Sequence, residues 1–377
     1  MSGIYIHIPF CKQACHYCDF HFSTSMTKKD AMVSALQREL ELRKDEFIDE
    51  VVETIYFGGG TPSVLTSEEI EQLIKTVHEN YAVSEKPEIT LEANPDDLSK
   101  NRIIQLSNSA INRLSIGVQS FFEEDLQLMN RAHSAQEAEE SLSLVTRKFE
   151  NISIDLIYGI PGMSNERWKQ NIEKALAFDI PHISSYALTV EPKTTLEYMI
   201  EKGQVKNVDD EQAREQFHIL VDTLEEKGFV NYEISNFGKE GYFSKNNTAY
   251  WQGKKYLGIG PSAHSFDGEK RGWNVRNNVK YLKSIQGDKL PLETEALTKR
   301  DRYNEYVMTG LRTIWGVSLK KIESEYGEKY RRHLLRQAEK FIEERLLELR
   351  EDILLATKKG KFLVDGIASD LFIVEME

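Results

Sequence analysis

The feature that most constrains the fold of this chain is the alternation of short apolar runs with longer amphipathic stretches in its first half. Six runs have the composition of β-strands, and segments with helical periodicity lie between them. The expected strands begin at Ile4, Thr54, Glu88, Ile111, Ile152 and His182, and the expected helices cover residues 30–48, 67–81, 135–149 and 165–177. Such a series favours an α/β fold with a parallel sheet. We therefore predict a partial (β/α)6 barrel that resembles a TIM barrel.

Polar and glycine-rich motifs follow the predicted strands. They are a cysteine-containing loop, "GGGTP" from Gly58, "EANP" from Glu92, "GVQS" from Gly117 and "GIPG" from Gly159. In parallel barrels the carboxyl ends of all strands lie at one end of the barrel, and active sites are built there. We expect the chemistry of this protein at that end.

The second half of the chain has a different pattern. A charged helix is expected over residues 209–228, and an aromatic and glycine-rich segment follows over residues 242–273. Later the sequence predicts charged helices, and the runs "ILLAT" and "KFLVDG" are expected to form a terminal β-hairpin. We divide the chain into a barrel with the cysteine loop (1–200), a barrel extension facing a ligand (201–290) and a small helical, winged α+β domain (291–377).

Composition narrows the class of partner and the compartment. The formal net charge is -13, which argues against nucleic acid or an anionic membrane as the main partner, because both require a basic face. No stretch approaches the ~20 apolar residues of a membrane span. The start "MSGIYIHIPF" lacks the basic and small-residue features of a signal peptide. We expect a cytoplasmic protein, in which thiols stay reduced.

Cys11, Cys15 and Cys18 are the only cysteines among the 377 residues, and they lie within eight consecutive positions. Three thiolates with His16 or His21 would complete a tetrahedral zinc site, but structural zinc usually joins two separated segments of chain. Here every candidate ligand lies on one loop. That arrangement favours a cubane [4Fe–4S] cluster with three thiolate ligands and one open iron. Zinc is the alternative.

The loop "CKQACHYC" resembles the cysteine loop of the radical S-adenosylmethionine (SAM) superfamily. The resemblance implies that the open iron binds the amino and carboxylate groups of SAM, and that an electron from the cluster cleaves SAM to an adenosyl radical. An arginine in the pocket would serve a carboxylate by a two-pronged pair, and a tyrosine ring would face the sulfonium. The SAM-binding residues implied by the resemblance are Tyr5, Tyr17, Gly59, Gly60, Thr61, Glu92, Gln119, Arg131, Asp155 and Ala187.

Further motifs, among them "YFGGGTPS", "SIGVQSF", "YALTVEP" and "GIGPSAHS", resemble the oxygen-independent coproporphyrinogen oxidase group. The true oxidases carry an amino-terminal extension and a further cysteine two residues past the third. Here ten residues precede Cys11, and position 20 is Phe20. Both departures favour the HemW-type heme chaperone branch, which implies heme as a ligand, an unidentified heme-acceptor protein and an electron donor for the cluster. The alternative is an oxidase that decarboxylates the propionates of coproporphyrinogen III.

The chaperone branch also carries a His-Asn-x-x-Tyr-Trp motif associated with heme. This chain reads "NNTAYW", so Asn247, Tyr250 and Trp251 match, whereas Asn246 stands at the histidine position. Asparagine is a poor ligand for heme iron, and His264 in "PSAHS" is the candidate substitute. The heme candidates are therefore Asn247, Tyr250, Trp251 and His264, and no catalytic residue is assigned.

Overall fold

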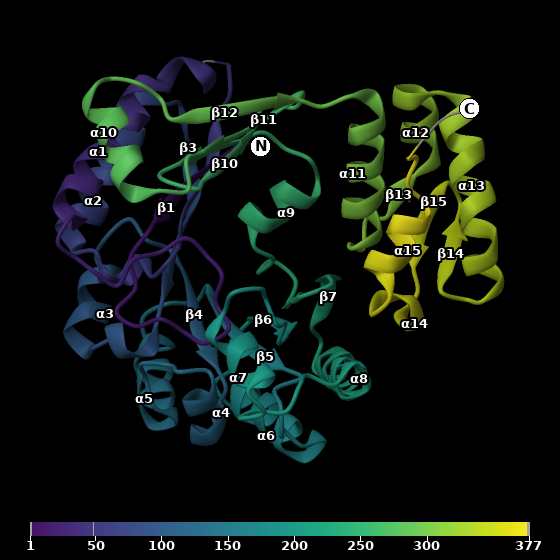
Figure 1. Cartoon of the computed structure of the whole chain (residues 1–377), viewed down its shortest axis with the longest axis horizontal. Helices are drawn as coiled ribbons and strands as arrows, with labels where there is room; N and C mark the ends of the chain where they lie inside the picture. Colours follow the sequence, from purple (N-terminus) through teal and green to yellow (C-terminus); the bar gives the residue numbers. More distant parts are fainter. Residues whose placement is uncertain (1, 48, 375–377) are drawn as a thin grey trace.

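The computed structural model describes residues 2–47 and 49–374, so position 48, the expected end of the first helix, lies outside the described residues. In this part of the chain one mixed sheet has the order β12-β11-β10-β9-β1-β2-β3-β4-β5-β6-β8-β7 (Figure 1). Its centre is parallel. The central strands are β1 (Ser2–Ile8), β2 (Val52–Gly59), β3 (Val83–Ala93), β4 (Arg113–Gln119), β5 (Ile152–Tyr158) and β6 (His182–Ala187). The predicted partial barrel of six β/α units is confirmed.

Helices connect the parallel strands. They are α1 (Lys29–Leu42), α2 (Ser67–Asn80), α3 (Lys100–Ser107), α4 (Glu123–Leu128), α5 (Ala135–Val145) and α6 (Asn165–Ala177), with α7 (Thr195–Glu201) and α8 (Asp210–Glu226) after β6. Capping boxes at Thr66 and Ser134 satisfy the first backbone N–H groups of α2 and α5. Helices α3 and α4 were not predicted from the sequence, because they are short and present few apolar residues to the core.

Further strands extend the sheet at both ends, and all their pairings except that of β9 with β1 are antiparallel. Beside β6 lie β8 (Asn236–Gly238) and β7 (Val230–Glu233), and beyond β1 lie β9 (Tyr256–Ile259), β10 (His264–Phe266), β11 (Lys270–Asn274) and β12 (Leu292–Ala296). Helices α9 (Lys245–Trp251) and α10 (Asn278–Gln286) belong to this extension. Strand β9 is parallel to β1, and α9 contacts β1 and β2, so the extension lies directly against the barrel.

A buried ion pair fastens the extension to α1. Glu39 accepts hydrogen bonds from Arg43 at 3.1 Å and from the side chain of Asn274 at 2.7 Å. Arg43 also donates to the carbonyl of Gly258 at 2.8 Å. A buried pair is tolerated only when its remaining donors and acceptors are satisfied, and the extension supplies these partners.

The C-terminal lobe has its own hydrophobic core. It comprises α11 (Lys299–Leu311), β13 (Val317–Ser318), α12 (Leu319–Tyr326), α13 (Glu328–Glu343), β14 (Leu347–Arg350), β15 (Ile353–Ala356), α14 (Lys358–Lys361) and α15 (Val364–Asp370). Figure 1 shows this lobe beside the sheet, with α9 between the sheet and α11. This lobe contains the hairpin β14–β15, which differs from the predicted hairpin of "ILLAT" with "KFLVDG". The division at residues 200/201 and 290/291 stays a prediction.

One expected strand of this lobe is wrong. The run "KFLVDG" belongs to the helical segments α14 and α15, and the hairpin partner of β15 is β14 instead. Val364, Ile367, Ala368 and Leu371 are all buried, and their spacing of three and four residues marks one face of a helix. No helix in the described ranges is both long and apolar enough to cross a membrane.

Candidate functional site

A cavity of about 730 Å³ lies inside the partial barrel toward the carboxyl ends of its strands; we call it the cofactor cavity. Its wall contains every residue that the sequence assigned to the cluster and to SAM except Ala187. Ala187 ends β6 and packs against the hydrophobic core beside the cavity. The fold thus brings together side chains from the cysteine loop and from β1 to β6.

The cysteine loop between β1 and α1 is held by a hydrogen bond within the loop and by one to the segment after α4. The amide of Cys11 donates to the carbonyl of Ser23 at 3.1 Å, and the amide of His16 donates to the carbonyl of Met129 at 3.0 Å. All three thiols are free and line the cofactor cavity. Burial raises the pKa of Cys11 and of Cys18 to about 11. Metal ligation at this loop must therefore release the thiol protons.

The zinc alternative needs a histidine beside the thiols. The ring of His16 bonds the carbonyl of Leu128 at 2.8 Å, and the ring of His21 bonds Asn278 at 2.7 Å. Neither histidine lines the cofactor cavity. Across residues 2–47 and 49–374, no group of three or more His, Cys, Asp or Glu side chains is gathered as for a single metal ion. The three thiols line the same cavity, and a three-thiol donor set fits an iron–sulfur cluster.

Arg131 lies beneath the cysteine loop, between α4 and α5. Its Nη1 donates to the Sγ of Cys15 at 3.3 Å, and its Nη2 donates to Asn94 Oδ1 at 2.7 Å and to the carbonyl of Gly117 at 2.8 Å. Both terminal nitrogens therefore have protein partners, and the two-pronged pair with a ligand carboxylate stays a prediction. The buried Nε has no partner. The guanidinium brings a positive charge to the wall of the cavity, which fits an anionic group there.

Glu92 on β3 is the main acidic group of the cofactor cavity. Its carboxylate accepts from the hydroxyl of Tyr56 at 2.7 Å and from the amide of Gly59 at 3.3 Å. Burial raises the pKa of Glu92 to about 7, and the negative charge of Asp155 adds to this shift. A buried carboxyl of this kind gains most from a cationic ligand, because a positive charge compensates the lost hydration.

Asp155 and Gln119 contribute from β5 and β4. Burial raises the pKa of Asp155 to about 6, although Arg131 opposes the shift. Gln119 ends β4 with φ 67, in the left-handed region, and its side chain accepts from the hydroxyl of Tyr186 at 3.3 Å. Non-glycine residues in that region are strained and occur often at functional sites. Tyr5 stacks on Tyr56, with ring centroids 6.1 Å apart.

The glycine motif holds the cysteine loop against the barrel. The amide of Gly60 donates to the carbonyl of Ile8 at 2.9 Å, and the amide of Thr61 donates to the carbonyl of Phe10 at 2.7 Å. A Cβ on Gly60 would lie 2.5 Å from the carbonyl oxygen of Phe10 and 2.8 Å from that of Ile8. Only glycine permits this close approach of two backbone segments.

The substitution Gly60→Ala is expected to lower the free energy of unfolding by about 1–3 kcal/mol, because the added methyl meets backbone atoms that cannot rotate away. Urea denaturation of the parent and the variant measures this change. Gly366→Ala in α15 is the control, since its Cβ meets no atom within 4 Å. Equal losses in the two variants would contradict the proposed close packing at Gly60.

The predicted heme-binding residues do not all line one cavity. Asn247 and Tyr250 line the cofactor cavity and also a second cavity, which Trp251 lines as well. His264 lines neither cavity. Asn246 is buried, and its Oδ1 accepts from Thr54 at 3.2 Å. The residue at the position of the motif histidine is therefore a structural hydrogen-bond partner of β2.

Several cavity residues were missed by the sequence analysis. They are polar side chains within otherwise apolar strands, namely Tyr56, Ser115, Ser184 and Tyr186, together with Asn94. The parallel register pairs Tyr5 with Tyr56, so the two rings project on the same side of the sheet. A polar residue within an otherwise apolar strand is the sequence signal that indicates such positions.

Comparisons with known proteins agree with this geometry. Residues 5–175 match the family model of the radical SAM superfamily, and residues 297–363 match that of the HemN C-terminal domain. Fold and site thus define a protein of the radical SAM superfamily, whose cofactors are a [4Fe–4S] cluster and SAM.

Relatives and one solved structure extend over nearly the whole chain. The heme chaperone HemW of Bacillus subtilis (strain 168) is 34% identical over 367 residues, which cover 96% of this chain and 97% of that protein. HemW of Lactococcus lactis subsp. lactis (strain IL1403) is 34% identical over 378 residues, with 97% and 98% coverage. The chain belongs to the HemW family. Coproporphyrinogen III oxidase (HemN) from Escherichia coli shares the fold, with a TM-score of 0.85 and 22% identity over 98% of this chain and 90% of that one.

Proposed function

We propose that this protein is a heme chaperone, which binds heme, one [4Fe–4S] cluster and SAM, and transfers heme to an acceptor protein. The observation that carries the proposal is the similarity to heme chaperones named HemW over almost the full length of both chains. The cofactor cavity supports it, because the donor set that a cluster and SAM require lies in one place. An electron donor for the cluster and a cytoplasmic location belong to the same proposal.

Five side chains of the cofactor cavity have a direct role in this proposal. Cys11, Cys15 and Cys18 hold the cluster, which together with SAM supplies one-electron chemistry when bound. Arg131 places its positive charge beside the thiol of Cys15. Glu92 binds the ammonium group of SAM. The other predicted SAM residues, apart from Ala187, form the wall around these groups.

The test is a heme titration of the anaerobically reconstituted protein, followed by its absorbance in the Soret region. We expect saturation at about one heme per chain with a dissociation constant in the micromolar range, as suits a ligand that is handed on. A parallel incubation with coproporphyrinogen III, SAM and a reductant is expected to give no decarboxylated product by mass spectrometry. Absence of saturable heme binding, or formation of that product, would overturn the chaperone assignment.

A further inference from the structure

A second cavity, of about 870 Å³, lies between the barrel extension and the C-terminal lobe. One side is formed by α9, β9, β10 and β11, and the other by α11 and α12; we call it the interlobe cavity. It shares Asn236, Asn247 and Tyr250 with the cofactor cavity. The volume is within the range of sites for small molecules and cofactors, which is roughly 300–1,000 Å³. The two cavities are thus neighbours with a common wall.

Aromatic rings form much of the wall of the interlobe cavity. They come from both sides, from Tyr250, Trp251, Tyr256 and Phe266 of the extension and from Tyr306 and Tyr326 of the C-terminal lobe. Tyr250 and Tyr256 pack edge to face with ring centroids 4.5 Å apart. Flat aromatic walls provide contact area for a planar apolar ligand, with little loss of side-chain entropy.

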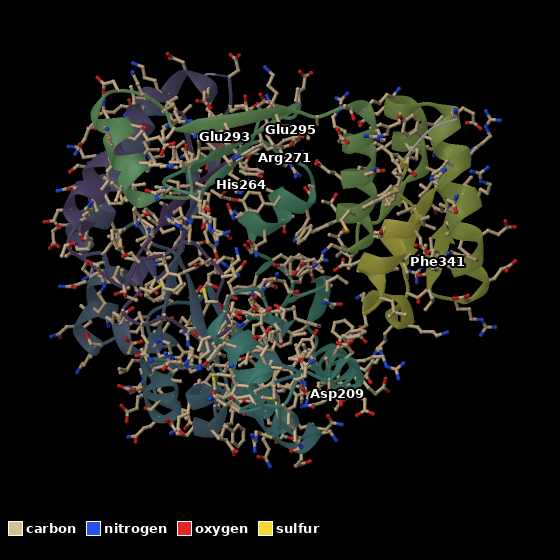
Figure 2. The ribbon with its side chains drawn as sticks, viewed as in Figure 1. Asp209, His264, Arg271, Glu293, Glu295 and Phe341 are labelled. Atoms are coloured by element: carbon tan, nitrogen blue, oxygen red, sulfur yellow. The ribbon has the colours of Figure 1, made fainter. Side chains whose placement is uncertain are left out.

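Three arginines line the same cavity, and each has a buried Nε that lacks a hydrogen-bond partner; they are Arg271, Arg302 and Arg312. Arg271 on β11 pairs with Glu305 on α11 at 3.0 Å (Figure 2 labels Arg271). Arg302 forms no ion pair with any described residue. A cavity lined by three guanidinium groups fits a ligand that carries carboxylates or phosphates.

The three arginines lie at two separate places in the interlobe cavity. Arg302 and Arg312 are ten residues apart along α11 and its end, which corresponds to about 15 Å along a helix. Arg302 lies one helical turn from Glu305, the partner of Arg271. Arg271 and Arg302 are therefore close to each other, whereas Arg312 lies at the other end, 5.1 Å above the ring of Trp251.

The acidic residues of the cavity do not cancel the positive charge at the end that holds Arg271 and Arg302. Glu305 is paired with Arg271, and Glu233 accepts from the amide of Ser235 at 3.0 Å. Burial raises the pKa of both carboxyls, which makes their ionised forms less favourable. Glu325 lines the cavity on α12.

We propose that the interlobe cavity binds the planar tetrapyrrole between its aromatic walls, with the propionate carboxylates on Arg271 and Arg302. This inference rests on the proposed function and names the residues that recognise the ligand. It places recognition on the carboxylates of the ligand, in a cavity that neither Asn246 nor His264 lines. The shared wall at Tyr250 sets the ligand beside the cofactor cavity.

The test compares hemin with hemin dimethyl ester, whose propionates are uncharged, by Soret titration of the reconstituted full-length protein. Arg302→Gln is expected to weaken hemin binding by about tenfold to a hundredfold, as for the loss of a charge-assisted hydrogen bond. Arg302→Lys is expected to restore part of the affinity. The ester is expected to bind weakly to the parent and equally weakly to Arg302→Gln.

Arg300→Gln is the matched control. Arg300 lies on the same helix and donates to the carbonyl of Val374 at 2.6 Å, outside the cavity, so its loss should leave hemin binding unchanged. Parental hemin affinity in Arg302→Gln, or equal affinity of the parent for hemin and its ester, would overturn the inference and leave the proposed function standing. A parent protein that binds no hemin would overturn both.

Discussion

Replacing Cys15 with alanine is expected to reduce the iron bound after anaerobic reconstitution from about four atoms per chain to nearly none. The reason is that a [4Fe–4S] cluster held by three thiolates has no spare protein ligand in this chain, which contains no fourth cysteine. Cys11→Ala and Cys18→Ala are expected to behave in the same way. Iron and sulfide content and the absorbance near 400 nm measure the loss.

The control for the cysteine variants is His21→Gln, which keeps a side-chain donor for Asn278 and removes the imidazole. It is expected to retain the full iron content. The three cysteines are half-buried and lie outside the hydrophobic core, so the variants should fold, and circular dichroism checks this. A parent protein that is colourless and holds zinc, which His21→Gln loses, would refute the cluster assignment.

The affinity for SAM is expected to rise roughly tenfold between pH 5.5 and pH 7, because the pKa of Glu92 in the ligand-free protein is about 7. At pH 5.5 this carboxyl is mostly protonated, and at pH 7 about half of it is ionised and attracts the ammonium group of SAM. Glu92→Gln should lose most of this pH dependence and bind SAM at least about tenfold more weakly at pH 7. Anaerobic calorimetric titration of the reconstituted protein measures both quantities.

The same raised pKa predicts how the stability of the ligand-free protein depends on pH. An unfolded chain ionises Glu92 near its ordinary value of 4.5, whereas the folded protein ionises it near 7, so this group destabilises the fold progressively as pH rises through that interval. Above pH 7 the ligand-free Glu92→Gln variant should therefore be at least as stable as the parent. A variant with weak SAM binding and a large loss of stability would mean that Glu92 acts as a structural group.

The sequence predicted the barrel and most of its cofactor site because both depend on local patterns. Strand-like runs with motifs at their ends specify a parallel α/β fold, and the carboxyl ends of its strands must meet. The spacing of Cys11, Cys15 and Cys18 on one loop likewise defines a donor set without reference to the rest of the molecule. Such features are read from neighbouring residues alone.

Other parts of the molecule required the tertiary structure. The run "KFLVDG" looked like a strand, and the packing of Val364 and Ile367 in the second core makes its segment helical. Tyr56 and Tyr186 became site residues only through strand register and burial. The raised pKa of Glu92 also results from burial, which depends on many distant residues.

The clearest division concerns the two cavities. The amino-acid sequence by itself determined a three-thiol loop at the end of the first strand of a parallel barrel, because the ligands are contiguous and the alternation of elements is regular. Only the tertiary structure decided that Arg271 and Arg302, from the extension and the C-terminal lobe, line one aromatic cavity beside Tyr250. Their proximity results from packing between two lobes, and no local spacing in the chain encodes it.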